Sequence, residues 1–177
     1  MQNQPTLQLT RRQALRHLGV AIGAIALLPA LPTFANDGRL DEATRLKHFN
    51  LGKKNLALSG YDPVSYHKGS PKKGSKSRAA RFKGVIYHFA NEENKQAFLK
   101  SASKYEPAYG GWCAWAMREG GKTEVDPKSY LIIDDQLYVF YKGFWGDTRA
   151  DWKKLAKKET NAALIKDADK GWNGFVG

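Results

Sequence analysis

Residues 81–94 (RFKGVIYHFANEEN) contain the signals for two strands, a turn and the start of a helix. Two extended runs surround the glycine-containing turn at Lys83-Gly84, a pattern that predicts a β-hairpin. Asn91 then precedes two acidic residues, which is typical of an N-cap and the first turn of a helix. A hairpin followed by a helix indicates an α+β fold, with a small antiparallel sheet and packed helices.

The rest of the chain predicts further elements of the same kind. Residues 55–58 and 64–67 are expected to form short strands, separated by a turn that contains Asp62-Pro63. Residues 130–133 and 137–141 flank a polar turn and predict a second hairpin, which we place at the centre of the sheet. Helical structure is expected within residues 36–50 and over residues 112–118, 145–158 and 161–172.

The N-terminus has the features of a twin-arginine export signal. Arg11 and Arg12 stand just ahead of an uncharged apolar stretch, residues 18–31, and Thr33-Phe34-Ala35 provides a small-residue cleavage site. The apolar stretch is shorter than the about 20 residues needed to span a bilayer. We therefore predict export by the twin-arginine translocase and a periplasmic location. A buried N-terminal helix or a membrane anchor is the alternative.

Length and charge are consistent with one basic domain. We divide the chain into a signal peptide (1–35), a lead-in segment (36–55) and a domain (56–173). The formal net charge of +12 falls to +9 when the three arginines of the signal are removed, because the signal contains no acidic residue. There is no internal repeat and no sign of a second domain.

Six basic residues, with no acidic residue among them, are expected to form a loop rich in Gly, Ser and Pro. In an exported protein this loop predicts contact with an anionic envelope surface or an acidic protein partner, and not with nucleic acid. The alternative is a solvated loop that keeps the protein soluble. The residues are Lys68, Lys72, Lys73, Lys76, Arg78 and Arg81.

Cys113 is the only cysteine, so no intrachain disulfide can form. If residues 112–118 are helical, Cys113 and Met117 face the same way, and His67 or His88 from elsewhere would complete a copper or zinc site. The alternative is that the cysteine and the methionine pack in the core. No motif activates Cys113 as a nucleophile, and Asp62 is expected to brace its turn. We therefore predict that the protein is not an enzyme.

The aromatic residues admit two interpretations. They are dense enough to line a ligand pocket, but small α+β domains also use aromatic side chains to fill their cores. Core filling is expected unless the structure contains a cavity. The residues concerned are Tyr61, Tyr66, Tyr87, Tyr105, Tyr109, Trp112 and Trp115.

Several sequence words resemble the YHS-domain family, in particular its exported bacterial branch. They are LSGYDPVSY (58–66), YHFA (87–90), YEPAYGGWCA (105–114), Asp126-Pro127, IDDQLY (133–138) and ADKGW (168–172). The resemblance implies a compact α+β domain. Metal-associated members of the wider family carry cysteines where this chain has Ser65 and Ala90 or Asn91. The resemblance therefore does not imply a thiolate-bound metal at that place.

These observations together predict an exported, single-domain, non-catalytic binding or accessory module. A metal ion is one expected ligand, with Cys113 and a histidine as the best-supported donors. Two alternatives stay open. One is a thiol-dependent redox protein or enzyme that uses Cys113, and the other is an envelope protein whose basic loop contacts an anionic surface.

Overall fold

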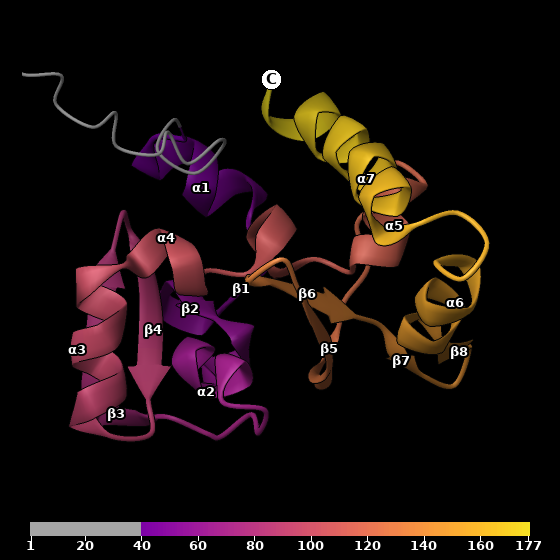
Figure 1. Cartoon of the computed structure of the whole chain (residues 1–177). Helices are drawn as coiled ribbons and strands as arrows, with labels where there is room; N and C mark the ends of the chain where they lie inside the picture. The colour runs from indigo at the N-terminus through magenta and orange to yellow at the C-terminus, as the bar shows by residue number, and fades with distance from the viewer. Residues whose placement is uncertain (1–39) are drawn as a thin grey trace, which may run out of the picture. The chain divides into compact units, whose positions relative to one another are not determined.

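The computed structural model describes residues 40–177, so the export signal predicted for residues 1–35, with Arg11 and Arg12, lies outside the described residues. Helices and small sheets are interspersed along the described chain (Figure 1), which confirms the α+β class. None of the helices described is both long enough and apolar enough to cross a membrane.

The larger sheet has four strands in the order β1-β2-β4-β3. Its pairing is mixed, because β2 runs parallel to β4 while the other neighbours are antiparallel. A parallel pair requires a crossover connection, and here α2 and β3 lie between β2 and β4 in the chain. The strands are β1 (Leu51–Gly52), β2 (Leu56–Ala57), β3 (Ser75–Phe82) and β4 (Val85–Phe89).

The hairpin predicted from residues 81–89 is confirmed as β3 and β4. Lys83 and Gly84 both have positive φ angles, 43° and 82°, as the two central residues of a tight hairpin turn require. Asn91 also caps α3 (Glu92–Lys100) as expected, because its side chain accepts a hydrogen bond of 2.8 Å from the backbone N–H of Asn94.

The strand predicted for residues 64–67 is wrong, because these residues form a short helix, α2 (Pro63–His67). Asp62 Oδ1 accepts a hydrogen bond of 2.9 Å from the N–H of Val64, and Pro63 occupies the start of the helix, where its missing N–H is not needed. Both residues therefore favour a helix start, which outweighs the apolar–polar alternation that follows.

The Asp62 carboxylate is completely buried and joins three elements. Besides capping α2, it accepts hydrogen bonds at Oδ2 from the backbone N–H of Ala90, at the end of β4, and from Nδ2 of Asn94 in α3, at 2.9 and 2.6 Å. Ser65 closes the same turn, since its hydroxyl donates to the Asp62 carbonyl and accepts from the N–H of Lys72. Asp62 therefore braces its turn as predicted, and it also anchors the neighbouring strand and helix.

The second predicted hairpin is confirmed as β5 (Asp126–Ile133) and β6 (Gln136–Phe140), but its expected place at the centre of the sheet is wrong. These strands form a separate two-stranded sheet. Leu137 and Val139 of β6 form bridges to Pro107 and Cys113. Because the connector of residues 107–113 lies along that edge of β6, the edge is not available to the larger sheet.

One helix follows the connector, and two more follow the second hairpin. α5 (Ala114–Arg118) is shorter than expected, because Cys113 has an extended backbone and precedes the helix. α7 (Asn161–Val176) packs on α5 at Gly171, where a Cβ atom would lie 2.0 Å from the carbonyl oxygen of Met117. α6 (Thr148–Leu155) begins later than expected, because β7 (Lys142–Gly143) and β8 (Gly146–Asp147) pair ahead of it.

The lead-in segment is helical, as predicted, in α1 (Glu42–His48), and it belongs to the core. Arg45 of α1 is completely buried and forms an ion pair with Glu106, which follows α4 (Ala102–Tyr105). Phe49 is also buried, with the Arg45 guanidinium 4.6 Å from its ring centre. The remaining short turns are η1 (Lys53–Asn55), η2 (Leu58–Gly60) and η3 (Ala108–Gly111).

The Asp62 network predicts a large stability loss for Asp62→Asn. The replacement amide places N–H donors against the donors of Val64, Ala90 or Asn94, so we expect a loss of about 3 kcal/mol in the free energy of unfolding. Urea denaturation followed by circular dichroism measures it. Asp147→Asn is the matched control, because the Asp147 Oδ1 acceptor that caps α6 is retained. Equal losses in the two variants would contradict the assignment of Asp62 as an anchor.

Candidate functional site

Cys113 is completely buried, and its sulfur contacts the residue that follows β6 and the first residue of α6. Sγ accepts a hydrogen bond of 3.3 Å from the N–H of Tyr141 and lies 3.4 Å from Oγ1 of Thr148. Met117, the second predicted sulfur ligand, is also completely buried, and its N–H donates to the Cys113 carbonyl at 2.9 Å. The two residues are therefore neighbours in the core, one turn apart.

The two predicted histidine ligands have other neighbours. His67, at the end of α2, places Nδ1 3.3 Å from Asp135 Oδ1 and its ring 5.1 Å from that of Tyr105. His88, on β4, lies beside Gly60. Partial burial lowers the pKa of both imidazoles, because desolvation disfavours their charged form.

Within residues 40–177, no group of three or more His, Cys, Asp or Glu side chains is placed to hold a metal ion. Neither histidine forms a hydrogen bond with Cys113 among the contacts of these residues. The copper or zinc site of Cys113, Met117 and a histidine therefore remains a prediction from spacing.

The basic segment predicted as a loop is a loop only in its first half. From Ser75 onward it forms β3, which is the edge strand of the larger sheet. Four of its cations already have partners. Lys68 contacts Glu93 at 3.1 Å, and Lys73 lies 4.5 Å from the Tyr61 ring centre. Arg78 donates to the Phe89 carbonyl at 3.4 Å, and Arg81 contacts Glu42 at 3.7 Å. Charged side chains on an edge strand also hinder pairing with another sheet, a structural role that needs no partner.

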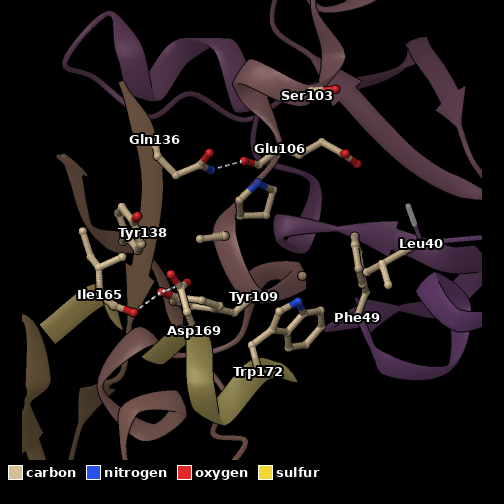
Figure 2. A pocket seen from close by; sticks show the side chains of 13 residues that line it. Leu40, Phe49, Ser103, Glu106, Tyr109, Gln136, Tyr138, Ile165, Asp169 and Trp172 are labelled. Carbon is tan, nitrogen blue, oxygen red and sulfur yellow. Dashed lines mark hydrogen bonds between the residues drawn. The ribbon is translucent and has the colours of Figure 1, made fainter. Parts of the chain in front are cut away.

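A pocket of about 400 Å³ lies where the two ends of α1, α4, the connector, β6 and α7 meet. Figure 2 shows its lining, which comes from segments far apart in the sequence. Of the seven aromatic residues for which a ligand pocket was one interpretation, only Tyr109 lines it. The lining residues are Leu40, Phe49, Ser103, Glu106, Pro107, Ala108, Tyr109, Gly110, Gln136, Tyr138, Ile165, Asp169 and Trp172.

Four aromatic side chains form a continuous wall of the pocket. Tyr109 contacts Tyr138 and Trp172, with ring centres 5.9 and 6.4 Å away, and Trp172 contacts Phe49 at 6.0 Å. All four side chains belong to buried residues, so the wall is held in place by packing on its other side. Only Tyr109 of these four was among the aromatic residues singled out from the sequence.

Asp169 lines the pocket, and its carboxylate contacts the aromatic wall. Its Oδ1 accepts a hydrogen bond of 3.0 Å from the Tyr109 hydroxyl (Figure 2). Partial burial raises the pKa of Asp169, because desolvation outweighs this hydrogen bond. Burial raises the pKa of Tyr138 to about 12, and the negative charge of Asp169 adds to this shift.

The second carboxylate, that of Glu106, is engaged on the side away from Asp169 (Figure 2). It forms the buried ion pair with Arg45 and accepts a hydrogen bond from the Tyr87 hydroxyl. Its backbone carbonyl accepts a hydrogen bond of 2.8 Å from Nε2 of Gln136. Glu106 therefore joins α1, β4 and β6 under the pocket and supplies little net negative charge to it.

An unusual backbone conformation positions Tyr109. Its φ angle is 55°, in the left-handed region that a bulky residue seldom adopts, and Gly110 follows at 60°. A Cβ atom on Gly110 would lie 2.6 Å from the Phe49 ring, so only glycine allows this close approach. The N–H of Asn50 donates to the Gly110 carbonyl at 2.9 Å, which holds the two segments together.

Asp169, Glu106 and Gln136 were not predicted as site residues. They lie in three of the sequence motifs that resemble the YHS-domain family: ADKGW, YEPAYGGWCA and IDDQLY, respectively. All three motifs contribute residues to the lining of this pocket. Comparison of the chain with protein-family models, with curated proteins and with solved structures found no match. The resemblance to the YHS-domain family therefore remains a prediction from the sequence words.

The burial of Cys113 predicts a thiol that does not react in the folded protein. Labelling with a soluble disulfide reagent should be at least about a hundredfold slower than in denaturant, because only opened molecules expose the sulfur. The matched control is a Cys113→Ala protein with Ser77→Cys on the exposed part of β3, which should react at once. Rapid labelling of the native, unsubstituted protein would favour the thiol-dependent alternative.

Proposed function

We propose that the protein is an exported, non-catalytic binding module that holds a small organic cation, such as an alkylammonium group, in the pocket beside Asp169. The single observation that carries this proposal is the half-buried Asp169 carboxylate against a wall of aromatic rings. A carboxylate with a raised pKa is less stable there than in water, and a bound cation would compensate that loss of solvation.

The charge of the lining supports a cationic ligand. The chain carries a net charge of +12, yet none of the described residues that line the pocket is Lys, Arg or His. An anionic ligand would meet Asp169 without a compensating cation. The pocket lining therefore lacks the positive charge of the rest of this basic protein, and this favours a cationic ligand.

The aromatic wall supports the same class of ligand. The faces of Tyr and Trp rings attract cations through their quadrupoles, and a nearby carboxylate adds Coulomb attraction. The volume of about 400 Å³ is within the range of small-molecule sites. Tyr109, Tyr138 and Trp172 are held by packing, so binding would require little ordering of side chains.

Export is part of the proposal and rests on the sequence alone. Arg11 and Arg12, the apolar stretch 18–31 and the Thr33-Phe34-Ala35 site together support recognition by the twin-arginine translocase and delivery to the periplasm. This route carries proteins that are already folded. A pocket lined from the ends of α1, α4, the connector, β6 and α7 would therefore be complete before transport.

The cation proposal is tested with three probes of similar branched shape: tetramethylammonium, tert-butanol and pivalate. Isothermal titration should detect tetramethylammonium binding and neither of the other two. Asp169→Asn keeps an acceptor for Tyr109 but removes the charge, so it should weaken tetramethylammonium binding by at least about tenfold. Because the pKa of Asp169 is raised, binding should weaken on acidification at a higher pH than for an ordinary aspartate.

Asp167→Asn is the matched control, since this carboxylate lies on the same helix but does not line the pocket. It should leave tetramethylammonium binding unchanged. Equal binding of pivalate, an Asp169→Asn variant that binds as well as the wild type, or no binding of tetramethylammonium at millimolar concentration would each overturn the assignment of a cation site.

Export is tested separately by replacing the arginine pair. Arg11→Lys combined with Arg12→Lys should leave the precursor in the cytoplasm, because the receptor reads the pair itself and not merely its charge. Cell fractionation measures the distribution of the protein. Arg16→Lys is the control and should be exported normally; if the double variant also reaches the periplasm, another route is used.

A further inference from the structure

Two adjacent aromatic side chains are almost fully exposed at the tip of the β7–β8 hairpin. Phe144 and Trp145 are 91% and 86% exposed, whereas the only other exposed large hydrophobic residue of the described chain, Leu99, is 50% exposed. Their rings meet edge to face with centres 5.0 Å apart, so they form one apolar projection. Burial of such a projection is expected when the protein meets an apolar surface.

The hairpin holds this projection in a defined position. Lys142 pairs with Asp147 and Gly143 with Gly146, which leaves Phe144 and Trp145 as the two connecting residues. The N–H of Trp145 donates a hydrogen bond of 3.1 Å to the Tyr141 hydroxyl, and that hydroxyl lies so close to Gly143 that a Cβ there would be 2.7 Å from it. A positioned tip loses little conformational freedom on binding.

Basic residues surround the tip in the sequence and on the helix that follows. Residues 142–158 contain six Lys or Arg residues and two Asp residues. One of the two acids, Asp147, caps α6 and lies 3.5 Å from Lys142, so part of its charge is already balanced. Four lysines of residues 153–158 are exposed. The segment therefore combines an apolar tip with net positive charge.

We propose that this hairpin docks the protein on an anionic lipid bilayer, with Phe144 and Trp145 inserted at the level of the headgroups. Tryptophan favours that level because its ring is apolar and its N–H is polar, and lysines near the surface add attraction to anionic lipids. Two side chains cannot supply the about 1,200 Å² of a stable protein interface, whereas a membrane contact requires only a small apolar wedge and positive charge. The proposal does not depend on the cation pocket.

The test uses the full chain and vesicles of equal parts phosphatidylcholine and phosphatidylglycerol, with phosphatidylcholine vesicles for comparison. Binding, measured by co-flotation, should require phosphatidylglycerol and should weaken as salt increases. Phe144→Ser combined with Trp145→Ser should reduce it by at least about tenfold, with an unchanged melting temperature because both side chains are exposed. Trp145→Phe should retain most of the binding but lose the blue shift of fluorescence caused by an inserted tryptophan.

Lys72→Gln combined with Lys73→Gln is the matched control for the other basic segment and should bind like the wild type. The proposal is overturned if the Phe144/Trp145 double variant binds vesicles as well as the wild type. Binding would then arise elsewhere, for example from the stretch 18–31 or from the region of Lys72 and Lys73. The proposal is also overturned if the tip instead joins two copies of the chain. In that case sedimentation would detect a dimer that the double variant abolishes, without vesicle binding.

Discussion

The buried carboxylate of Asp62 is the constraint from which much of the domain follows. Its two oxygens accept hydrogen bonds from α2, from the end of β4 and from α3, so these elements must meet in one arrangement. β4 carries Tyr87, whose hydroxyl donates to Glu106, and Glu106 in turn pairs with Arg45 of α1. Two buried polar clusters, one at Asp62 and one at Glu106, are thus connected through β4.

The pocket itself depends on local backbone conformations more than on regular structure. The left-handed backbone at Tyr109 and Gly110 lets Phe49 approach the connector and directs the tyrosine hydroxyl to Asp169. Backbone strain of this kind persists only where surrounding contacts compensate it, and here the bond from Asn50 to the Gly110 carbonyl does so. A partly desolvated carboxylate and a strained tyrosine then lie side by side, and both features are enriched at functional sites.

Local signals predicted much of the fold. The Lys83-Gly84 turn, the Asn91 cap and the apolar runs around residues 134–135 are each determined within a few residues, and the structure confirms them. What failed depended on distant partners or on competing local signals. Val64-Ser65-Tyr66-His67 alternates like a strand but follows Asp62-Pro63, and the edge of β6 is occupied by the connector. The pocket could not be predicted, because Glu106, Gln136 and Asp169 are brought together by tertiary packing alone.

Because α7 is the last helix of the chain, the pocket is completed late in synthesis. Ile165, Asp169 and Trp172 line the pocket from α7, and Gly171 fixes that helix directly against the Met117 carbonyl. The ribosome synthesises α7 after every other element of the pocket. The lining of the pocket is therefore complete only when residues through Trp172 have emerged, and a nascent chain interrupted before α7 would lack the packing of Trp172 on Tyr109 and Phe49.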